Sequence, residues 1–176
     1  MGFPASPSAM DQMSAKILFS IMAALCVSGS EAKAQDFGLP VGSSAPIASV
    51  QALDGSTVSL AQYVGKGPVL IQFWAAWCGT CRELMPSFQR AQALYGSRVK
   101  FVAIAVSANE SLERVRRYSA AHKFTHQVLY DATGQAVDRY NVPATSYVVV
   151  LDRNGKIVYT GVGGDQDLVA AVRRGL

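Results

Sequence analysis

The chain contains four runs that are rich in apolar residues, at positions 68–74, 99–106, 147–151 and 156–160. Nearly continuous apolar runs of this length are typical of strands that are buried on both faces of a sheet. The last two runs are separated by Asp-Arg-Asn-Gly, and Asn-Gly is a strong signal for a hairpin turn. We therefore predict four strands, of which the last two pair as a β-hairpin.

Apolar residues at helical spacing predict three helices between and after these strands. The first helix ends near residue 95, and one of its faces carries Leu84, Phe88, Ala91 and Tyr95. Gly96 follows it as a stop signal. The other two helices are expected within residues 111–121 and 166–174, and Asp165 is the predicted N-cap of the last one.

Residues 36–57 are rich in Gly, Pro, Ser and Ala, which predicts an irregular lead-in with room for a short β-hairpin. The order of the remaining elements is strand, helix, strand, helix, hairpin and helix. This order is typical of an α/β domain in which helices flank a central mixed sheet. Half of the 176 residues are hydrophobic and 16% are charged, which fits one soluble globular domain of ordinary size.

The charge of the chain is only mildly basic. Sixteen Lys and Arg residues face twelve Asp and Glu residues, so the formal net charge is +4. The sequence contains no run of Lys and Arg, which argues against a nucleic-acid ligand. We therefore expect no nucleic-acid partner and at most a slight preference for acidic ones.

Residues 1–34 have the features of an N-terminal prefix followed by a secretory signal peptide. Lys16 precedes an apolar stretch at residues 17–29, and the small-residue pattern Ala32-Lys33-Ala34 follows it. The stretch is shorter than the roughly 20 apolar residues that a membrane span needs. We predict cleavage after Ala34 and a mature domain of residues 35–176 in the periplasm or another extracytoplasmic compartment. An uncleaved membrane anchor is the alternative.

Two of the three cysteines carry the candidate chemistry. Cys26 lies inside the signal stretch and would be removed with it, whereas Cys78 and Cys81 follow the first buried strand and open a helix. At a helix N-terminus the dipole and the unpaired backbone N–H groups stabilise a thiolate, which is the attacking form of the thiol. We predict that Cys78 is the nucleophile and that Cys81, one turn later, releases the mixed disulfide.

The cysteine spacing alone leaves two other interpretations open. His122 and His126 would complete a Cys2His2 zinc site if the fold brought them to the cysteines, although both are expected at the surface near a helix end. A purely structural disulfide is the second interpretation. It would close a very short loop and would restrain the unfolded chain little. We predict neither a bound metal nor a cofactor.

Residues 73–81, FWAAWCGTC, followed by Arg82 and Pro86, resemble the active-site strand, redox motif and kinked helix of thioredoxin-like proteins. Pro86 cannot donate a hydrogen bond to the carbonyl of Arg82, so the helix is expected to bend there. The resemblance implies a thioredoxin-like fold with the CxxC motif at the N-terminus of the first core helix. Trp77 is predicted to shield the sulfurs or to form an exposed patch that binds a substrate peptide, and Gly79 and Thr80, between the cysteines, are predicted to tune the redox potential.

A second part of the resemblance lies ahead of the third strand. Val142-Pro143-Ala144-Thr145 resembles the cis-proline loop that faces the cysteines in this fold. Because cis peptide bonds are rare outside X–Pro, Pro143 is the predicted cis-proline. The resemblance further implies that the backbone of Val142 pairs with a bound substrate chain.

The resemblance covers roughly residues 41–176 and is strongest to the exported TlpA/ResA/DsbE branch of redoxin-type thiol:disulfide oxidoreductases. That branch keeps disulfides of exported proteins reduced, often those of the haem-site cysteines of apocytochrome c. It draws electrons from a membrane thiol donor of the DsbD/CcdA type. The resemblance therefore implies a reductase, and we expect it to act as a monomer.

Two positions depart from the family pattern. Gln72 stands where thioredoxin has a buried Asp that assists proton transfer at the second cysteine, and Gln72 cannot titrate. Leu84 stands where the redoxin branch has a Glu, and Glu83 is one residue earlier. One residue turns a side chain by about 100° around a helix, so Glu83 is predicted to lie on the surface.

Three alternatives to the reductase hypothesis remain at this point. An oxidase or isomerase on the same fold would differ in which form of the cysteine pair is stable. A copper chaperone would hold Cu(I) on the two thiolates, because soft sulfur suits that ion. A binding module would carry the pair as an inert disulfide.

Overall fold

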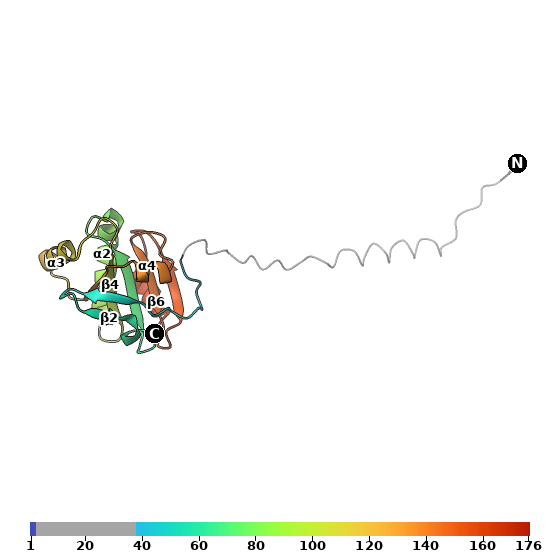
Figure 1. The fold of residues 1–176 in the computed structure, drawn as a ribbon. Helices are drawn as coiled ribbons and strands as arrows, with labels where there is room; N and C mark the ends of the chain where they lie inside the picture. The colour runs from blue at the N-terminus through green and yellow to red at the C-terminus, as the bar shows by residue number, and fades with distance from the viewer. Residues whose placement is uncertain (3–37) are drawn as a thin grey trace. The chain divides into compact units, whose positions relative to one another are not determined.

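The computed structural model describes residues 1–2 and 38–176. Within the latter, seven strands form one mixed sheet in the order β2-β1-β5-β4-β3-β6-β7, and helices pack around it (Figure 1). The predicted signal peptide, its cleavage after Ala34 and Cys26 fall outside the described residues. In the part of the chain that the structure describes, no helix is long and apolar enough to cross a membrane.

The strands are β1 (Ser49–Ala52), β2 (Thr57–Ser59), β3 (Val69–Trp74), β4 (Lys100–Val106), β5 (Gln127–Asp131), β6 (Tyr147–Leu151) and β7 (Ile157–Gly161). The helices are the short 3-10 helix η1 (Leu60–Gln62) and the α-helices α2 (Gly79–Tyr95), α3 (Leu112–Ala121), α4 (Gln135–Arg139) and α5 (Leu168–Arg173). All four predicted strands and all three predicted helices are therefore confirmed. The hairpin expected in the lead-in is the antiparallel pair of β1 and β2.

Strand β3 lies inside the sheet, parallel to β4 on one side and antiparallel to β6 on the other. All six of its residues are buried, which explains why all of them except Gln72 are apolar. The β6–β7 hairpin turns through Gly155, whose φ of 77° lies in the left-handed region that glycine adopts at little cost. Because α2 follows β3, it begins near the middle of the sheet, at the end where the C-terminus of β3 lies.

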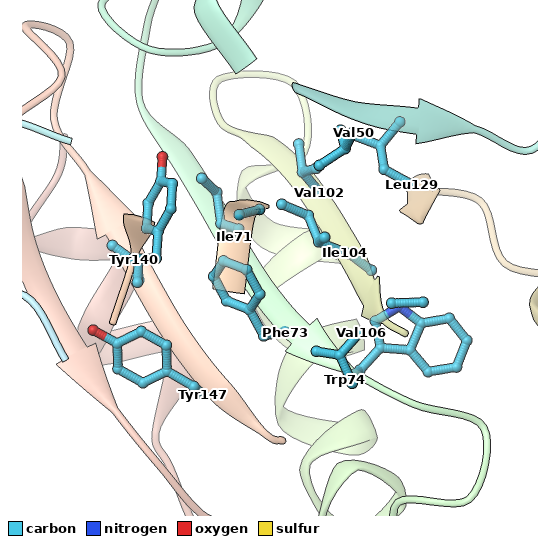
Figure 2. Close-up of a cluster of buried hydrophobic side chains, with 14 of the residues drawn as sticks. Val50, Ile71, Phe73, Trp74, Val102, Ile104, Val106, Leu129, Tyr140 and Tyr147 are labelled. Carbon is cyan, nitrogen blue, oxygen red and sulfur yellow. The ribbon is translucent and has the colours of Figure 1, made fainter. Parts of the chain in front are cut away.

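Apolar side chains cover both faces of the sheet. Alternate residues of a strand point to opposite faces, and Leu70 of β3 belongs to one buried cluster while Ile71 and Phe73 belong to another. The first cluster contains the apolar faces of α2 and α5. The second, drawn in Figure 2, packs the ring of Phe73 against Tyr140 and Tyr147, with centroid separations of 5.5 and 6.1 Å.

Three local features differ from the sequence prediction. Strand β5 and helix α4 were not predicted, because the apolar stretch of β5 is only three residues long between Gln127 and Asp131, and α4 spans only five residues. The N-cap of α5 is Asp167 rather than Asp165. The carboxylate of Asp167 accepts a hydrogen bond of 3.0 Å from the backbone N–H of Ala170, which fixes the start of the helix two residues later than expected.

Candidate active site

The two cysteines are joined by a disulfide at the N-terminus of α2. Cys78 is the N-cap of the helix, and its Sγ atom accepts a hydrogen bond of 3.0 Å from the backbone N–H of Cys81. In this arrangement the sulfur takes the place of the side-chain oxygen that usually caps a helix. The first sulfur therefore lies where unpaired N–H groups and the helix dipole favour negative charge.

The loop between β3 and α2 is short and tightly bonded. The backbone N–H of Cys78 donates to the carbonyl of Ala75 at 3.1 Å, and the indole Nε1 of Trp77 donates to the carbonyl of Ala108 at 3.0 Å. Only 2% of Cys78 and 3% of Cys81 is exposed, whereas Trp77 is 47% exposed. In the disulfide form the two cysteines are thus covered, whereas the side chain of Trp77, the residue before Cys78, is half exposed.

Glu110, which the sequence analysis did not identify, holds the same loop. Its side chain is fully buried, and its carboxylate accepts hydrogen bonds from the backbone N–H groups of Ala76 at 2.7 Å and of Ser111 at 3.0 Å. The guanidinium of Arg114 lies 3.6 Å from Oε1, the carboxylate oxygen that accepts the N–H of Ser111, and Arg114 is half exposed. Glu110 therefore ties the start of α3 to the segment that leads into Cys78.

Ser146 is a second site residue that the sequence analysis missed. Its hydroxyl lies 3.2 Å from Oγ1 of Thr80, and Thr80 Oγ1 lies 3.4 Å from Sγ of Cys78. Ser146 is 1% exposed and has a φ of 66°, a conformation that a non-glycine residue adopts only when its surroundings hold it. Ser146 is thus connected to Cys78 from the β6 side through Thr80.

The prediction of a cis-proline at Pro143 is wrong. The described residues contain no cis peptide bond, and Pro143 is exposed, three residues before the serine that contacts Thr80. The backbone N–H of Val142 donates to the carbonyl of Val137 at 3.0 Å, so this group is already engaged within the chain. The tetrapeptide matched the family pattern in composition, but the close approach occurs at Ser146, where β6 begins beside the end of β3.

Trp77 and Val142 nevertheless come together at one surface hollow of about 290 Å³. The hollow is lined by Trp77, Val106, Ser107, Ala108, Gly134, Val137, Val142, Ala144 and Thr145. Pro143 is absent from this lining. Most of these side chains are apolar, so the hollow can receive an apolar side chain of another protein next to the cysteine pair.

The two departures from the family pattern have clear structural outcomes. Gln72 is 2% exposed, and its Nε2 atom has no hydrogen-bond partner within the described structure. Leu84 is fully buried in the core beneath α2, whereas Glu83 is exposed, as predicted. Neither position presents a buried carboxylate to the second cysteine.

The two histidines belong to a cluster of rings between α3 and β5. The ring of His122 stacks on Tyr118 with centroids 3.9 Å apart, and the ring of His126 lies 4.7 Å from those of Phe88 and Phe124. Burial lowers the pKa of His126 to about 4. His122 is exposed as expected, whereas His126 is partly buried, which corrects the prediction that both histidines lie on the surface.

Comparisons with known proteins agree with this geometry. The Redoxin family model matches residues 40–174. Thioredoxin-like protein YneN of Bacillus subtilis is 35% identical over 130 residues, which make up 73% of this chain and 75% of that protein. Thiol-disulfide oxidoreductase ResA of Geobacillus thermodenitrificans is 28% identical over 130 residues, or 73% of this chain and 74% of that protein.

The solved structures are similar in the same way. A thiol:disulfide interchange protein of the thioredoxin family from Chlorobium tepidum is 27% identical and has a TM-score of 0.64, covering 78% of this chain and 98% of that chain. The mixed sheet, its flanking helices and a CxxC pair at the start of α2 are the thioredoxin-like arrangement. The chain belongs to the redoxin family and is a thioredoxin-like thiol:disulfide oxidoreductase.

Proposed function

We propose that this protein reduces disulfides of exported proteins in an extracytoplasmic compartment, with Cys78 as the nucleophile and Cys81 as the resolving cysteine. The observation that carries the proposal is the position of Cys78 Sγ as the N-cap of α2, where it accepts the N–H of Cys81. A sulfur in this place is stabilised as a thiolate, and only the thiolate attacks a disulfide. The similarity to a thiol-disulfide oxidoreductase, ResA, supports the same chemistry.

The exchange begins with the pair in its dithiol form. The Cys78 thiolate attacks one sulfur of the substrate disulfide, the substrate S–S bond breaks, and the other substrate sulfur leaves as a thiolate. Cys81 then attacks Cys78 Sγ, its proton passes to the departing thiolate, and the second substrate sulfur is released. The substrate gains two electrons, and the Cys78–Cys81 disulfide is restored.

The hollow beside Trp77 is the proposed binding place for the substrate chain. An apolar side chain next to the substrate cysteine would enter it and contact the exposed face of the indole ring. Val142 lines the same hollow. Pro143 does not line it, so it would contact the substrate only outside the hollow. The haem-site cysteines of apocytochrome c are the proposed substrates, since they form a disulfide between residues close together in an extended chain.

The spent disulfide must be reduced again before the next cycle. We propose a membrane dithiol donor of the DsbD/CcdA type, which would supply two electrons and two protons. The proposed secretory signal at residues 1–34 would direct the chain to the compartment in which such a donor delivers its electrons. An oxidising compartment requires such a donor, because a nearby cysteine pair there is otherwise oxidised.

A trapping experiment tests the assignment of the two cysteines. In Cys81→Ser the mixed disulfide on Cys78 cannot be resolved, so exported proteins should accumulate as covalent adducts that dithiothreitol releases. Cys78→Ser is the matched control and should trap nothing. Equal trapping by both variants, or by neither, would contradict the proposed roles, and the identity of the adducts tests the proposed substrate class.

The redox potential tests the direction of electron flow. Equilibration of the purified protein with glutathione should give a potential well below the value of about −120 mV that is typical of DsbA-type oxidants. A potential near that value would replace the reductase proposal with an oxidase on the same fold. In either case catalysed reduction of insulin by dithiothreitol distinguishes an active pair from an inert disulfide.

A further inference from the structure

A chain of hydroxyl groups connects Cys78 to the opposite side of the site. Thr80 Oγ1 lies 3.4 Å from Cys78 Sγ, and it donates a hydrogen bond of 3.2 Å to Oγ of Ser146. Ser146 Oγ also accepts the backbone N–H of Gly163 at 3.1 Å. The sulfur is thus linked through two side-chain hydroxyls to a backbone donor on the loop that follows β7.

The backbone of Ser146 is fixed independently of its side chain. Its N–H donates to the carbonyl of Phe73 at 2.8 Å, and its carbonyl accepts Nε2 of Gln166 at 2.9 Å. Gln166 is itself buried and is held by a hydrogen bond of 3.0 Å from the hydroxyl of Tyr159. These contacts hold Ser146 at its positive φ and aim its hydroxyl at Thr80.

The hydrogen bonds of this chain fit the disulfide form. A disulfide sulfur is a weak acceptor, so the Thr80 hydroxyl donates to Ser146 instead. Ser146 Oγ then accepts two hydrogen bonds, from Thr80 and from Gly163, which fills both of its lone pairs. A thiolate at Cys78 would change this balance, because an ionised sulfur is a much stronger acceptor.

We infer that Ser146 is a positioning residue that stabilises the Cys78 thiolate through Thr80, by a reversal of this hydroxyl chain on reduction. A dithiol donor gives two electrons and two protons to the disulfide: Cys81 keeps one proton as a thiol, and the other passes to water. The Thr80 hydroxyl then donates to the Cys78 thiolate, and the Ser146 hydroxyl donates to Thr80 Oγ1. The Gly163 N–H remains on Ser146 Oγ and polarises the chain toward the sulfur.

This inference rests on the proposed role of Cys78 as the nucleophile. It adds a residue from the start of β6, 66 positions away from Thr80, to the groups that set the redox potential. Neither Thr80 nor Ser146 carries a charge, so variants at these two residues leave the formal charges of the site unchanged.

The test measures the pKa of the Cys78 thiol, from the ultraviolet absorbance of its thiolate, and the equilibrium with glutathione. Thr80→Val should reduce the thiolate-to-thiol ratio about tenfold, because it removes a hydrogen bond to a charged group. Ser146→Ala should reduce the thiolate-to-thiol ratio about threefold, because it leaves the hydrogen bond from Thr80 to the thiolate in place and removes only the strengthening of that bond by Ser146. The glutathione equilibrium should move toward the disulfide in both variants, by about 30 mV for a tenfold change.

The double variant identifies the route. If Ser146 acts through Thr80, then Thr80→Val/Ser146→Ala should match Thr80→Val alone, and Thr80→Ser, which keeps the hydroxyl, should match the parent. Ser146→Gly removes the same hydroxyl at a φ that glycine adopts freely, so it provides the measurement if alanine destabilises the fold.

Three results would overturn the inference, and the first of them would also overturn the proposed function. A parent whose Cys78 thiol titrates like that of free cysteine would overturn it together with the proposed function. A reactive parent Cys78 that responds to neither Ser146→Ala nor Ser146→Gly, or an effect of Ser146→Ala that persists in the Thr80→Val background, would overturn the inference alone.

Discussion

The buried carboxylate of Glu110 accepts a hydrogen bond of 2.7 Å from the backbone N–H of Ala76, two residues before Cys78. The same carboxylate accepts the N–H of Ser111, the N-cap of α3. One side chain therefore holds together the loop that leads into Cys78 and the start of α3. A buried charge of this kind is tolerated because backbone donors and the nearby Arg114 compensate it.

Removal of this carboxylate should destabilise the fold and loosen the loop. Glu110→Ala leaves the N–H groups of Ala76 and Ser111 without their acceptor, which we expect to lower the free energy of unfolding by about 3 kcal/mol. Urea denaturation measures this loss, and hydrogen exchange should become faster at the Ala76 amide. Arg114→Ala removes only the half-exposed partner at 3.6 Å, and it should cost less than about 1 kcal/mol. Equal losses in the two variants would contradict the role assigned to Glu110.

The partly buried ring of His126 should make the fold sensitive to acid. Its pKa is about 4 in the folded protein and about 6.5 in the unfolded chain, so the unfolded chain binds more protons between these values. Stability should therefore fall as the pH decreases from about 6.5 to about 4, by up to about 3 kcal/mol from this residue. His126→Phe keeps a ring against Phe88 and Phe124 and should remove this part of the pH dependence.

The pH experiment has a matched control in the same ring cluster. His122→Gln removes the exposed ring that stacks on Tyr118 but retains His126, so it should keep the fall in stability. Urea unfolding at a series of pH values gives the comparison for the parent and both variants. A parallel pH profile for His126→Phe and the parent would show that burial of His126 is not the cause.

Trp77 should matter for protein substrates more than for small ones. Trp77→Ala removes the exposed wall of the hollow, so we expect kcat/KM for a protein disulfide to fall about tenfold, the effect of losing one well-placed aromatic contact. Reduction of a small aromatic disulfide, which needs no hollow, should change much less. Leu94→Ala alters another exposed apolar side chain, on the last turn of α2, and should leave both rates unchanged. A proportional loss with both substrates would indicate a change at the sulfurs instead.

Gln72 should be replaceable by an apolar residue of similar size. Its Nε2 atom is buried without a partner, so Gln72→Leu is expected to raise the free energy of unfolding by about 1 kcal/mol. Because Gln72 cannot take up a proton, insulin reduction should proceed at the parent rate. Thermal unfolding and the insulin assay check the two expectations separately. A large loss of turnover in this variant would assign Gln72 a role at the second cysteine.

Much of the fold was predictable from the sequence because full burial produces a local signal. Strand β3 is buried over its whole length, and its nearly continuous apolar run identified it. Helix α2 was likewise visible in the spacing of its buried residues. Strand β5 was not predicted because polar residues, exposed Gln127 and buried Asp131, stand at its two ends. The burial of Asp131 depends on the folded chain, in which its carboxylate accepts a hydrogen bond from the backbone N–H of Val137.

The sequence by itself determined the position of the cysteine pair, since the cap on α2 joins residues three positions apart and depends on local geometry alone. Tertiary structure alone decided what surrounds that pair. Glu110 meets Ala76 across 34 positions and Ser146 meets Thr80 across 66, and no periodicity in the chain records such contacts. The prediction for Pro143 failed for the same reason: the loop approaches the site where β6 is hydrogen-bonded to β3, and that register brings Ser146 to Thr80, which lies beside Cys78.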